Sequence, residues 1–420
     1  MKIAILGSGG REHAIANQIT KSTIVEKLYC IPGNAGTKSI AENIILDIYN
    51  FESLGKFVDD YKIDLVIVGP EKPLVEGVVD FLSKKKVKVF GPNKCVSKLE
   101  GSKIFTKKIC EKYNIPTAGF KVFDNSDQAY KYLENSKMPI VVKADGLASG
   151  KGVYICKDLE SSKNAVDEIF DGKFGLAKEL LIEEFLEGDE MSYFVISDGK
   201  TFKKFNTAQD HKRVGEGDKG KNTGGMGAYS PSGLINDDLD EKIINKIVKP
   251  TFKAIKDMDE TYKGFLYVGL MIKDNNPYLV EYNVRMGDPE CQTILPLLKS
   301  DFLKLILSCC EENLENQIIE WEDKKSMCIV LCSKGYPESY KKNIEIPNIE
   351  KIKNNDFFFT YHAGTESNKN KVYATGGRVL NFVCISEDFK NSRNLVIEKI
   401  ESLNWHNGFY RKDIGYKVID

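Results

Sequence analysis

The sequence contains few of the residues that build metal centres and disulfide frameworks. Its 420 residues include four histidines and ten cysteines, and no two cysteines have the C-x-x-C spacing of zinc and redox motifs. We therefore expect no zinc site, and we expect reduced cysteines that fill hydrophobic cores. No apolar run approaches the roughly 18 residues that a membrane-spanning helix needs, so no spanning segment is expected.

A surplus of charge of one sign is absent as well. There are 60 basic and 61 acidic residues, which gives a net charge of −1. This balance offers no electrostatic footprint for nucleic acid or for a membrane, so neither is expected as a partner. The opening MKIAIL runs directly into glycines and is too short for a signal sequence, which predicts a cytoplasmic protein. A chain of this length predicts two to four domains.

The first hundred residues alternate short apolar runs with helical stretches. This pattern predicts a doubly wound parallel sheet of the Rossmann-like kind. Such sheets bind ligands at the carboxyl ends of their strands, so the turns after these runs should converge on one pocket. The runs occupy residues 3–6, 27–31, 44–48, 65–68 and 87–90.

The first of these turns, GSGGRE at residues 7–12, has part of a dinucleotide fingerprint. That fingerprint needs glycine where Glu12 stands, so the match to NAD(P) binding is weak. Phosphate or sugar phosphate at the N-terminus of the next helix, beside Arg11, is the favoured interpretation. A glycine turn that only packs tightly is the alternative.

Residues 141–153, VVKADGLASGKGV, predict a glycine hairpin that covers phosphate groups. Backbone N–H groups and the two lysines suit a polyphosphate. The segment fails the Walker A pattern, because three residues separate its glycines and Gly152 replaces the serine or threonine. Its flanking apolar runs indicate strand–loop–strand, and an ordinary hairpin is the alternative.

Residues 280–290, VEYNVRMGDPE, predict a metal-binding strand. Glu281, Asn283 and Arg285 occupy alternate positions, so on a strand they would lie on one face. An acid and an amide can hold Mg²⁺, and the arginine can bind a charged oxygen. Asp288 in the following turn would point back at this site, although a simple polar turn is the alternative.

Further segments carry weaker signals. A capping box from Ser97 to Glu100 should open a helix that carries Lys103. Asn114-Ile-Pro116 should end this helix. Residues 181–190 predict an apolar strand that turns into an acidic loop, which could contact adenine and ribose or could simply be solvated. DHKR at 210–213 precedes a long glycine-rich loop at 214–232, and both could contact substrate. A helix is expected over residues 237–256, and a polar linker over 311–325.

Residues 103–296 resemble the ATP-grasp superfamily, and the whole chain resembles its phosphoribosylamine–glycine ligase family (glycinamide ribonucleotide synthetases). One departure is the strand at 264–272, which lacks the second acid of many ATP-grasp enzymes. The matching segments are GSGGREHA at 7–14, PGNAGT at 32–37, IVGPE at 67–71, LEGSK at 99–103, QDHKR at 209–213, NTGGMGAYSP at 222–231, GDPE at 287–290 and RKDIG at 411–415.

The resemblance implies an α/β and α+β multidomain fold. It places a Rossmann-like substrate domain at 1–100, an ATP-grasp domain at 101–320 with a mobile ATP-lid subdomain at 117–190, and a small α+β domain at 321–420. It implies ATP-dependent ligation of glycine to 5-phosphoribosylamine through glycyl phosphate, in de novo purine biosynthesis. ATP, Mg²⁺ or Mn²⁺ and these two small molecules are the expected ligands, and a monomer is expected.

The resemblance also implies roles for residues that match the family's motifs. Catalytic roles fall on Arg285, Asp288 and Lys143. Metal binding falls on Glu281 and Asn283. Nucleotide binding falls on Lys103, Lys143, Gly146, Gly150, Lys151, Gly152, Glu183, Glu184, Phe185, Leu186 and Glu190. Substrate binding falls on Gly9, Gly10, Arg11, Asn34, Gly36, Thr37, Glu71, Asp210, Lys212, Gly287, Pro289 and Arg378.

Two other classes of function stay open. Another ATP-grasp carboxylate ligase, such as a biotin carboxylase or an aminoimidazole ribonucleotide carboxylase-type enzyme, would release ADP in the presence of bicarbonate. A nucleotide-sensing protein without turnover would not need a charge-neutralising set directed at a γ-phosphate. The set present here is Lys103, Lys143, Glu281 and Arg285. An oxidoreductase is disfavoured by Glu12.

Overall fold

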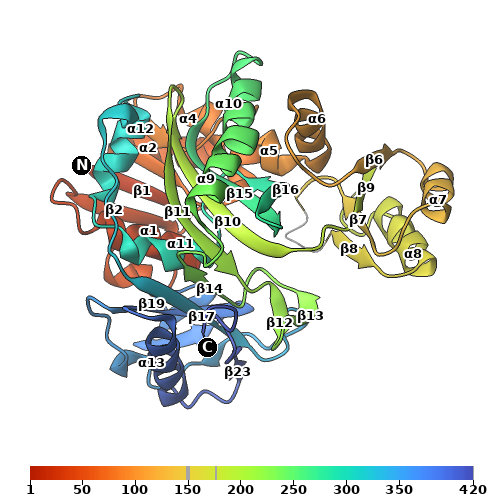
Figure 1. Ribbon diagram of the computed structural model, residues 1–420. Coiled ribbons are helices and arrows are strands. Elements are labelled where there is room, and N and C mark those ends of the chain that lie inside the picture. The colour runs from red at the N-terminus through yellow and green to blue at the C-terminus, as the bar shows by residue number, and fades with distance from the viewer. Residues whose placement is uncertain (148–151, 176, 420) are drawn as a thin grey trace.

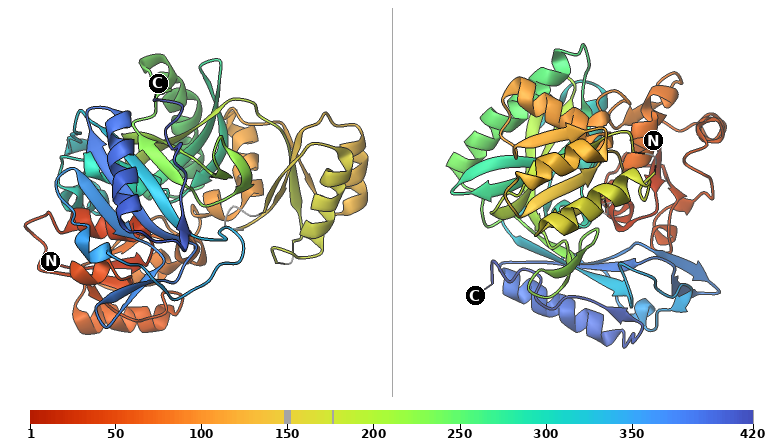
Figure 2. Two further views of the ribbon diagram at one scale, coloured as in Figure 1. Left: turned by 90° about the horizontal axis from the view of Figure 1, so that it is seen from below. Right: turned by 90° about the vertical axis from the view of Figure 1, so that its right-hand side faces the viewer.

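The computed structural model describes residues 1–147, 152–175 and 177–419 (Figure 1). It contains an N-terminal parallel sheet, a small sheet that stands apart on one side, and a long sheet that connects the rest (Figure 2). Among the described residues, no helix is long and apolar enough to cross a membrane.

The N-terminal sheet is parallel and has the strand order β3-β2-β1-β4-β5. Alternate residues of β1 are buried on opposite faces, since Ile3 and Ile5 join one core while Ala4 and Leu6 join another. The predicted doubly wound sheet is therefore confirmed. Its elements are β1 (Lys2–Gly7), α1 (Gly10–Ile19), β2 (Lys27–Pro32), β3 (Glu42–Asn43), α2 (Phe51–Tyr61), β4 (Leu65–Val68), α3 (Glu71–Glu76), α4 (Val78–Leu82) and β5 (Lys88–Phe90).

One predicted strand of this sheet is wrong. The apolar run at residues 44–48 is irregular, and the edge strand is only the two-residue β3 before it. Ile45 is 88% exposed and only Ile48 of this run is buried, so the run does not enter the core along its whole length as the other runs do. The run has the apolar residues of a strand but lies at the sheet's edge, where nothing covers Ile45.

The small sheet is antiparallel with the order β6-β9-β7-β8, and it has a core of its own. Its two helices lie against each other, so they cover the same face. Strands β7 and β8 pair on either side of the glycine segment, which confirms the predicted strand–loop–strand arrangement. The elements are β6 (Phe120–Phe123), α7 (Ser126–Glu134), β7 (Ile140–Ala144), β8 (Val153–Cys156), α8 (Leu159–Phe170) and β9 (Leu180–Glu184).

The long sheet joins the centre of the chain to its C-terminal part. Its order is β16-β15-β10-β11-β14-β17-β22-β19, and β23 pairs with β17. The predicted glycine-rich loop at 214–232 is wrong in part, because it holds strand β14 and most of a hairpin, β12–β13. The strands are β10 (Asp189–Asp198), β11 (Phe202–Asp210), β12 (Arg213–Gly215), β13 (Lys219–Asn222), β14 (Gly227–Ser230), β15 (Lys263–Lys273), β16 (Asn276–Asn283), β17 (Lys325–Ser333), β19 (Phe358–His362), β22 (Arg378–Ser386) and β23 (Gly408–Phe409).

Helices and a smaller sheet cover the long sheet. The helix expected over 237–256 is present as α9 and α10, joined through a π-helical turn at Ile244–Val248. Within the predicted linker, a short 3-10 helix occupies Leu314–Asn316. The remaining elements are α9 (Asp237–Ile243), α10 (Lys249–Lys256), α11 (Glu290–Ile294), α12 (Phe302–Cys310), α13 (Phe389–Ser402), β18 (Ile344–Glu345), β20 (Thr365–Asn368) and β21 (Lys371–Ala374).

The helix expected from the capping box at Ser97 is broken in two. Helix α5 (Lys98–Gly101) ends at Ser102, which has an extended backbone and accepts a hydrogen bond from the N–H of Phe105. Ser102, and not Ser97, therefore caps α6 (Lys103–Tyr113), the helix that carries Lys103. The predicted end of that helix is confirmed, since Asn114 adopts the left-handed conformation with φ of 55°.

Glu12, the residue that disfavours dinucleotide binding, is buried at the start of α1. Its Oε2 accepts a hydrogen bond from the N–H of Gly9 at 2.7 Å, and its Oε1 accepts one from Nε of Arg11 at 2.7 Å. A Cβ atom at Gly7 would lie 2.5 Å from this side chain, and one at Gly69 would lie 2.1 Å from Oε1. Glycines at the ends of β1 and β4 thus leave space for a buried carboxylate.

Replacing Gly69 with alanine should destabilise the protein because the new methyl group collides with Glu12. We expect a loss of about 1–3 kcal/mol, the usual cost of overpacking, seen as a lower midpoint of thermal unfolding. In a Glu12→Ala background the same substitution should cost much less, which a double-mutant cycle measures. An equal cost in both backgrounds would show that this contact does not require the glycine.

Candidate active site

Three buried charged residues lie where α6 meets the small sheet. Lys143 on β7 has its Nζ 2.9 Å from Oε1 of Glu183, and Lys107 on α6 has its Nζ 3.2 Å from Oε2 of the same residue. All three are less than a tenth exposed. Although burial opposes it, the two lysines hold the pKa of Glu183 below its ordinary value. The net positive charge of this group suits a polyphosphate.

Lys103 lies one helical turn before Lys107 and donates a hydrogen bond to the carbonyl of Gly146 at 2.8 Å. It therefore joins the glycine segment to α6. Burial lowers the pKa of both Lys103 and Lys107. Sequence reasoning did not identify Lys107, although its spacing of four from Lys103 places both side chains on one face of the helix.

Other residues expected to bind nucleotide lie on β9 and on the segments that adjoin β7 and β9. Gly152 accepts a hydrogen bond from the N–H of Ala144, and Glu183 and Glu184 end β9. Phe185 and Leu186 follow directly in the chain. Gly150 and Lys151 lie outside the described residues.

Glu281 and Asn283 both lie on β16, as expected, and Gly269 on β15 is opposite Glu281. The position opposite Glu281 on the neighbouring strand is therefore a glycine, where many ATP-grasp enzymes have a second acid. Among the described residues no group of three or more His, Cys, Asp and Glu could hold a metal ion. Glu281 and Asn283 are thus two candidate protein ligands. Two protein ligands are enough for Mg²⁺, because this ion commonly takes its remaining ligands from substrate phosphates and water.

The prediction that Arg285 shares a strand face with Glu281 and Asn283 is wrong, because β16 ends at Asn283. Its guanidinium instead lies between two acids, with Nη2 2.8 Å from Oε1 of Glu100 and Nε 3.3 Å from Oε2 of Glu71. A buried arginine needs such partners, and they come from the start of α3 and from α5. Glu100 was expected only as a helix cap.

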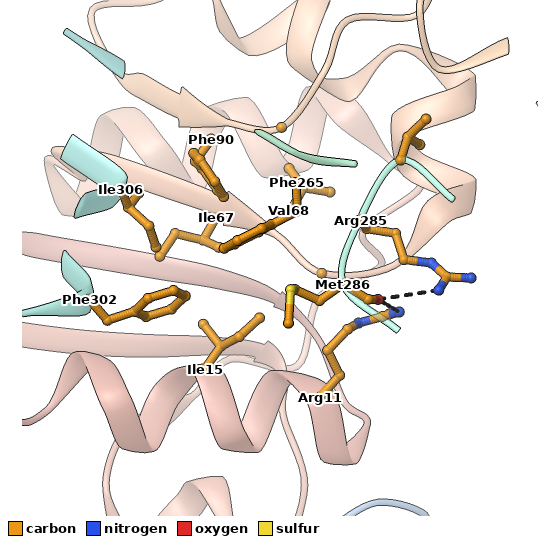
Figure 3. A pocket seen from close by; sticks show the side chains of 13 residues that line it. Arg11, Ile15, Ile67, Val68, Phe90, Phe265, Arg285, Met286, Phe302 and Ile306 are labelled. Atoms are coloured by element: carbon orange, nitrogen blue, oxygen red, sulfur yellow. Dashed lines mark hydrogen bonds between the residues drawn. The ribbon is translucent and has the colours of Figure 1, made fainter. Parts of the chain in front are cut away.

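Arg11 approaches Arg285 from the N-terminal unit. Both guanidinium groups donate to the carbonyl of Met286, at 3.3 Å and 3.2 Å, and both line a pocket with an apolar floor (Figure 3). Two like charges so close favour an anion or several carboxylates between them. The structure therefore brings together Arg11, Glu71 and Arg285, which lie far apart in the sequence.

Arg378, at the start of β22, brings the C-terminal part of the chain to the same place. Its Nη1 donates to the carbonyl of Asp288 at 2.6 Å and lies 3.2 Å from Oδ1 of that residue. Burial opposes ionisation, but Arg378 and Arg11 hold the pKa of Asp288 below its ordinary value. Gly287 and Pro289 flank Asp288, and a Cβ at Gly9 would be 3.3 Å from its Oδ2.

The loop at 32–37 uses its polar side chains within the protein. Asn34 donates to the carbonyls of Ser8 and His362, both at 2.8 Å, and accepts from the N–H groups of Gly36 and Thr37. These bonds occupy the side chain of Asn34. Asn34 therefore joins this loop to the first glycine turn and to β19. Any ligand contacts of the loop would have to be made by its other groups.

Gly10 and Gly36 permit close packing at the same junction. A Cβ at Gly10 would lie 2.2 Å from the amide nitrogen of Asn381, and one at Gly36 would lie 2.2 Å from the ring of His13 and 2.7 Å from the ring of His362. Tight contact between the N-terminal and C-terminal parts therefore explains both glycines.

Lys212 lies just beyond the end of β11 and reaches two acids. Its Nζ is 2.8 Å from Oε2 of Glu190 and 4.0 Å from Oε1 of Glu281. Glu190 belongs to strand β10 and not to the acidic loop expected from the sequence. Lys212 therefore connects a residue expected to bind nucleotide with one expected to bind metal.

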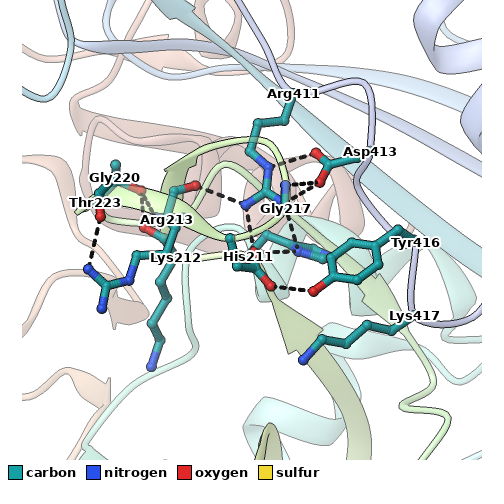
Figure 4. A network of polar contacts seen from close by, with 12 residues as sticks. His211, Lys212, Arg213, Gly217, Gly220, Thr223, Arg411, Asp413, Tyr416 and Lys417 are labelled. Carbon is teal, nitrogen blue, oxygen red and sulfur yellow. Dashed lines mark hydrogen bonds and ion pairs between the residues drawn. The ribbon is translucent and has the colours of Figure 1, made fainter. Parts of the chain in front are cut away.

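A network at the C-terminus holds the segment that carries Lys212 (Figure 4). Arg411 is 1% exposed and donates to Oδ1 of Asp218 and to Oδ2 of Asp413, both at 2.7 Å. His211, next to Lys212, accepts a hydrogen bond from the N–H of Gly415 at 3.0 Å. The QDHKR and RKDIG segments are thus in direct contact.

The small antiparallel sheet beside a larger one, with lysines at their junction and an acid and an amide on β16, defines an ATP-dependent ligase of the ATP-grasp class. The biotin carboxylase domain of 2-oxoglutarate carboxylase from Hydrogenobacter thermophilus has the same fold. It aligns with a TM-score of 0.72 at 14% identity, over 96% of this chain and 89% of that one.

Three family models match consecutive parts of the chain, so it belongs to the phosphoribosylglycinamide synthetase family. They are the N domain over residues 1–100, the ATP-grasp (A) domain over 101–291 and the C domain over 326–417.

Relatives of known name match over nearly the full length. A phosphoribosylamine–glycine ligase from Caldanaerobacter subterraneus subsp. tengcongensis is 45% identical over 99% of both chains. One from Brucella melitensis is 41% identical over 100% of this chain and 99% of that one. The crystal structure of phosphoribosylamine–glycine ligase from Thermotoga maritima aligns with a TM-score of 0.86 at 32% identity, over 99% of this chain and 100% of that one.

Replacing Lys143 with alanine should weaken ATP binding because it removes one cation and leaves Glu183 less compensated. We expect an increase in the dissociation constant of about 10- to 100-fold, the range for loss of a charged hydrogen bond. Calorimetric titration with a non-hydrolysable ATP analogue measures it. Lys163→Ala is the control, since this lysine pairs with Glu134 on the outer helices. Equal affinity of the two variants would contradict the role of Lys143.

Proposed function

We propose that this protein ligates glycine to 5-phosphoribosylamine with ATP, giving glycinamide ribonucleotide, ADP and phosphate in de novo purine biosynthesis. The observation that carries the proposal is the meeting of Arg285, Asp288 and Arg378 with the N-terminal turn at Arg11. These residues come from three separate parts of the chain. The relatives of the same length bear the name of this reaction.

The reaction proceeds in two steps. A carboxylate oxygen of glycine attacks the γ-phosphorus of ATP, the bond to the β,γ-bridging oxygen breaks, and ADP leaves. The amine nitrogen of phosphoribosylamine then attacks the carbonyl carbon of glycyl phosphate, loses a proton and displaces phosphate. Phosphoryl transfer between anions depends mainly on positioning and on charge neutralisation. Lys103 and Lys143 hold the ATP phosphates for the first step.

Mg²⁺ or Mn²⁺, when bound, neutralises charge on the phosphate oxygens. Glu281 and Asn283, both on β16, would hold the ion. Arg285 neutralises the charge that develops on the carboxylate and the transferring phosphoryl group. Its two acids, Glu71 and Glu100, keep its guanidinium in a fixed position.

The N-terminal turns hold the ribose phosphate amine. Gly9, Gly10 and Arg11 contribute from the start of α1, where backbone N–H groups and the helix dipole favour an anion. Arg378 and Asp288 face them from the other side. We further propose the division into domains at 1–100, 101–320 and 321–420, closure of 117–190 over ATP, and a cytoplasmic monomer.

ADP release should require glycine and phosphoribosylamine together. Phosphoribosylamine is generated in the cuvette from phosphoribosyl pyrophosphate and ammonia, and ADP is followed by a coupled assay. Omission of either substrate should reduce the rate to background. Without glycine the acyl phosphate does not form, and without phosphoribosylamine it has no acceptor. Release with bicarbonate in place of glycine would instead indicate a carboxylase.

Replacing Arg285 with alanine should lower turnover by about 10²–10³-fold, as loss of an oxyanion donor does. The same assay measures it, with ATP affinity determined separately to show that the nucleotide still binds. Arg393→Ala on α13, outside the site, is the control. Turnover of Arg285→Ala equal to that of the control would contradict the proposed role.

A further inference from the structure

Helix α6 joins the small sheet to the rest of the candidate site. It contacts β9 of the small sheet and β16 of the long sheet (Figure 1). It also carries two of the lysines described above, Lys103 and Lys107. The way in which this helix is held against the small sheet therefore decides how its lysines meet Lys143 on β7.

The first turn of α6 has an unfavourable charge. Lys103 is the first residue of the helix, and the turn contains no acidic residue of its own. A cation at the N-terminus of a helix is destabilising, because the helix dipole places partial positive charge there. Lysine at this position therefore requires an acid from another part of the chain.

Asp145, directly after β7, supplies this acid. Its Oδ1 accepts a hydrogen bond from the N–H of Ile104 at 3.1 Å, and its Oδ2 accepts one from the hydroxyl of Ser102 at 3.0 Å. Burial lowers the pKa of Lys103, and the charges of Glu281 and Asp145 oppose this effect. Asp145 thus does for the first turn of α6 what an acidic residue within that turn would do.

Two further contacts tie α6 to the same end of β7. Nζ of Lys103 donates to the carbonyl of Gly146 at 2.8 Å. One helical turn later, Lys107 shares the carboxylate of Glu183 with Lys143. Contacts at two successive turns fix both the distance and the rotation of the helix relative to β7. The ammonium groups of the lysines are therefore positioned by the helix as a whole.

We propose that Asp145 is a positioning residue for ATP: by binding the first turn of α6, it holds Lys103 where this lysine and Lys143 act on the same phosphate chain. This rests on the proposed function and adds to it a residue that acts through another one. The carboxylate of Asp145 is occupied by the helix, and as an anion it would repel the phosphates if it faced them. Its effect on the nucleotide is therefore exerted through Lys103.

Asp145→Ala should raise the dissociation constant of a non-hydrolysable ATP analogue by about 10-fold, the effect of losing a charge-assisted hydrogen bond. In a Lys103→Ala background the same substitution should raise it by less than about threefold, because no ammonium group remains to be positioned. Calorimetric titration of the wild type, both single variants and the double variant completes this cycle. The KM for glycine should stay unchanged in Asp145→Ala.

Asp158→Ala is the matched control. Asp158 caps α8 on the same small sheet, where its Oδ1 accepts a hydrogen bond from the N–H of Ser161 at 2.8 Å. Its helix carries no residue expected to bind nucleotide. The control should lower the midpoint of thermal unfolding, as Asp145→Ala does, and leave the affinity for the analogue unchanged. If Asp145→Ala does not fold, Asp145→Asn, which removes the charge and keeps an acceptor for Ile104, takes its place in the cycle.

Two results would overturn the proposal. Equal affinity of Asp145→Ala and Asp158→Ala would show that the contact with α6 does not affect nucleotide binding. The same loss of affinity with and without Lys103 would show that Asp145 acts independently of this lysine. Absence of glycine-dependent ADP release by the wild type would instead refute the proposed function, and the calorimetric cycle would still decide the role of Asp145.

Discussion

The structure depends on the burial of Arg285 between two acids from distant parts of the chain. A guanidinium removed from water needs carboxylates at hydrogen-bond distance, and removing one of them would leave an uncompensated charge. Glu71 begins α3 of the N-terminal unit, and Glu100 lies on α5. Because both must reach the same side chain, the end of β16 is fixed against the carboxyl edge of the N-terminal sheet.

The long sheet applies a similar constraint to the C-terminal part. Strand β14 pairs with β11 on one side and β17 on the other, so the centre of the chain and its last hundred residues share one set of backbone hydrogen bonds. Arg378 therefore reaches Asp288 from a strand of this sheet. Arg411 then fixes the hairpin beside Lys212 through Asp218. The groups proposed to act in the reaction are positioned by elements that are remote in sequence.

Much of the fold could be predicted from local patterns. The buried strands of the N-terminal sheet, the hairpin around the glycine segment and the end of α6 follow from apolar runs, turn residues and the left-handed Asn114. The run at 44–48 could not, because its composition is that of a strand while its place at the edge is decided by its neighbours. The break at Ser102 could not either, because Glu100 and Ser102 bind Arg285 and Asp145, which are distant in the sequence.

The sequence by itself determined the class of chemistry, since lysines, glycines and the Glu-x-Asn pair are the groups that bind phosphates and a divalent ion whatever fold presents them. Only the tertiary structure decided which of these groups act together. Lys107 beside Lys143 and Glu100 beside Arg285 have no local signal in the chain. Their pairing arises because buried charges require partners, and packing determines which partners are near.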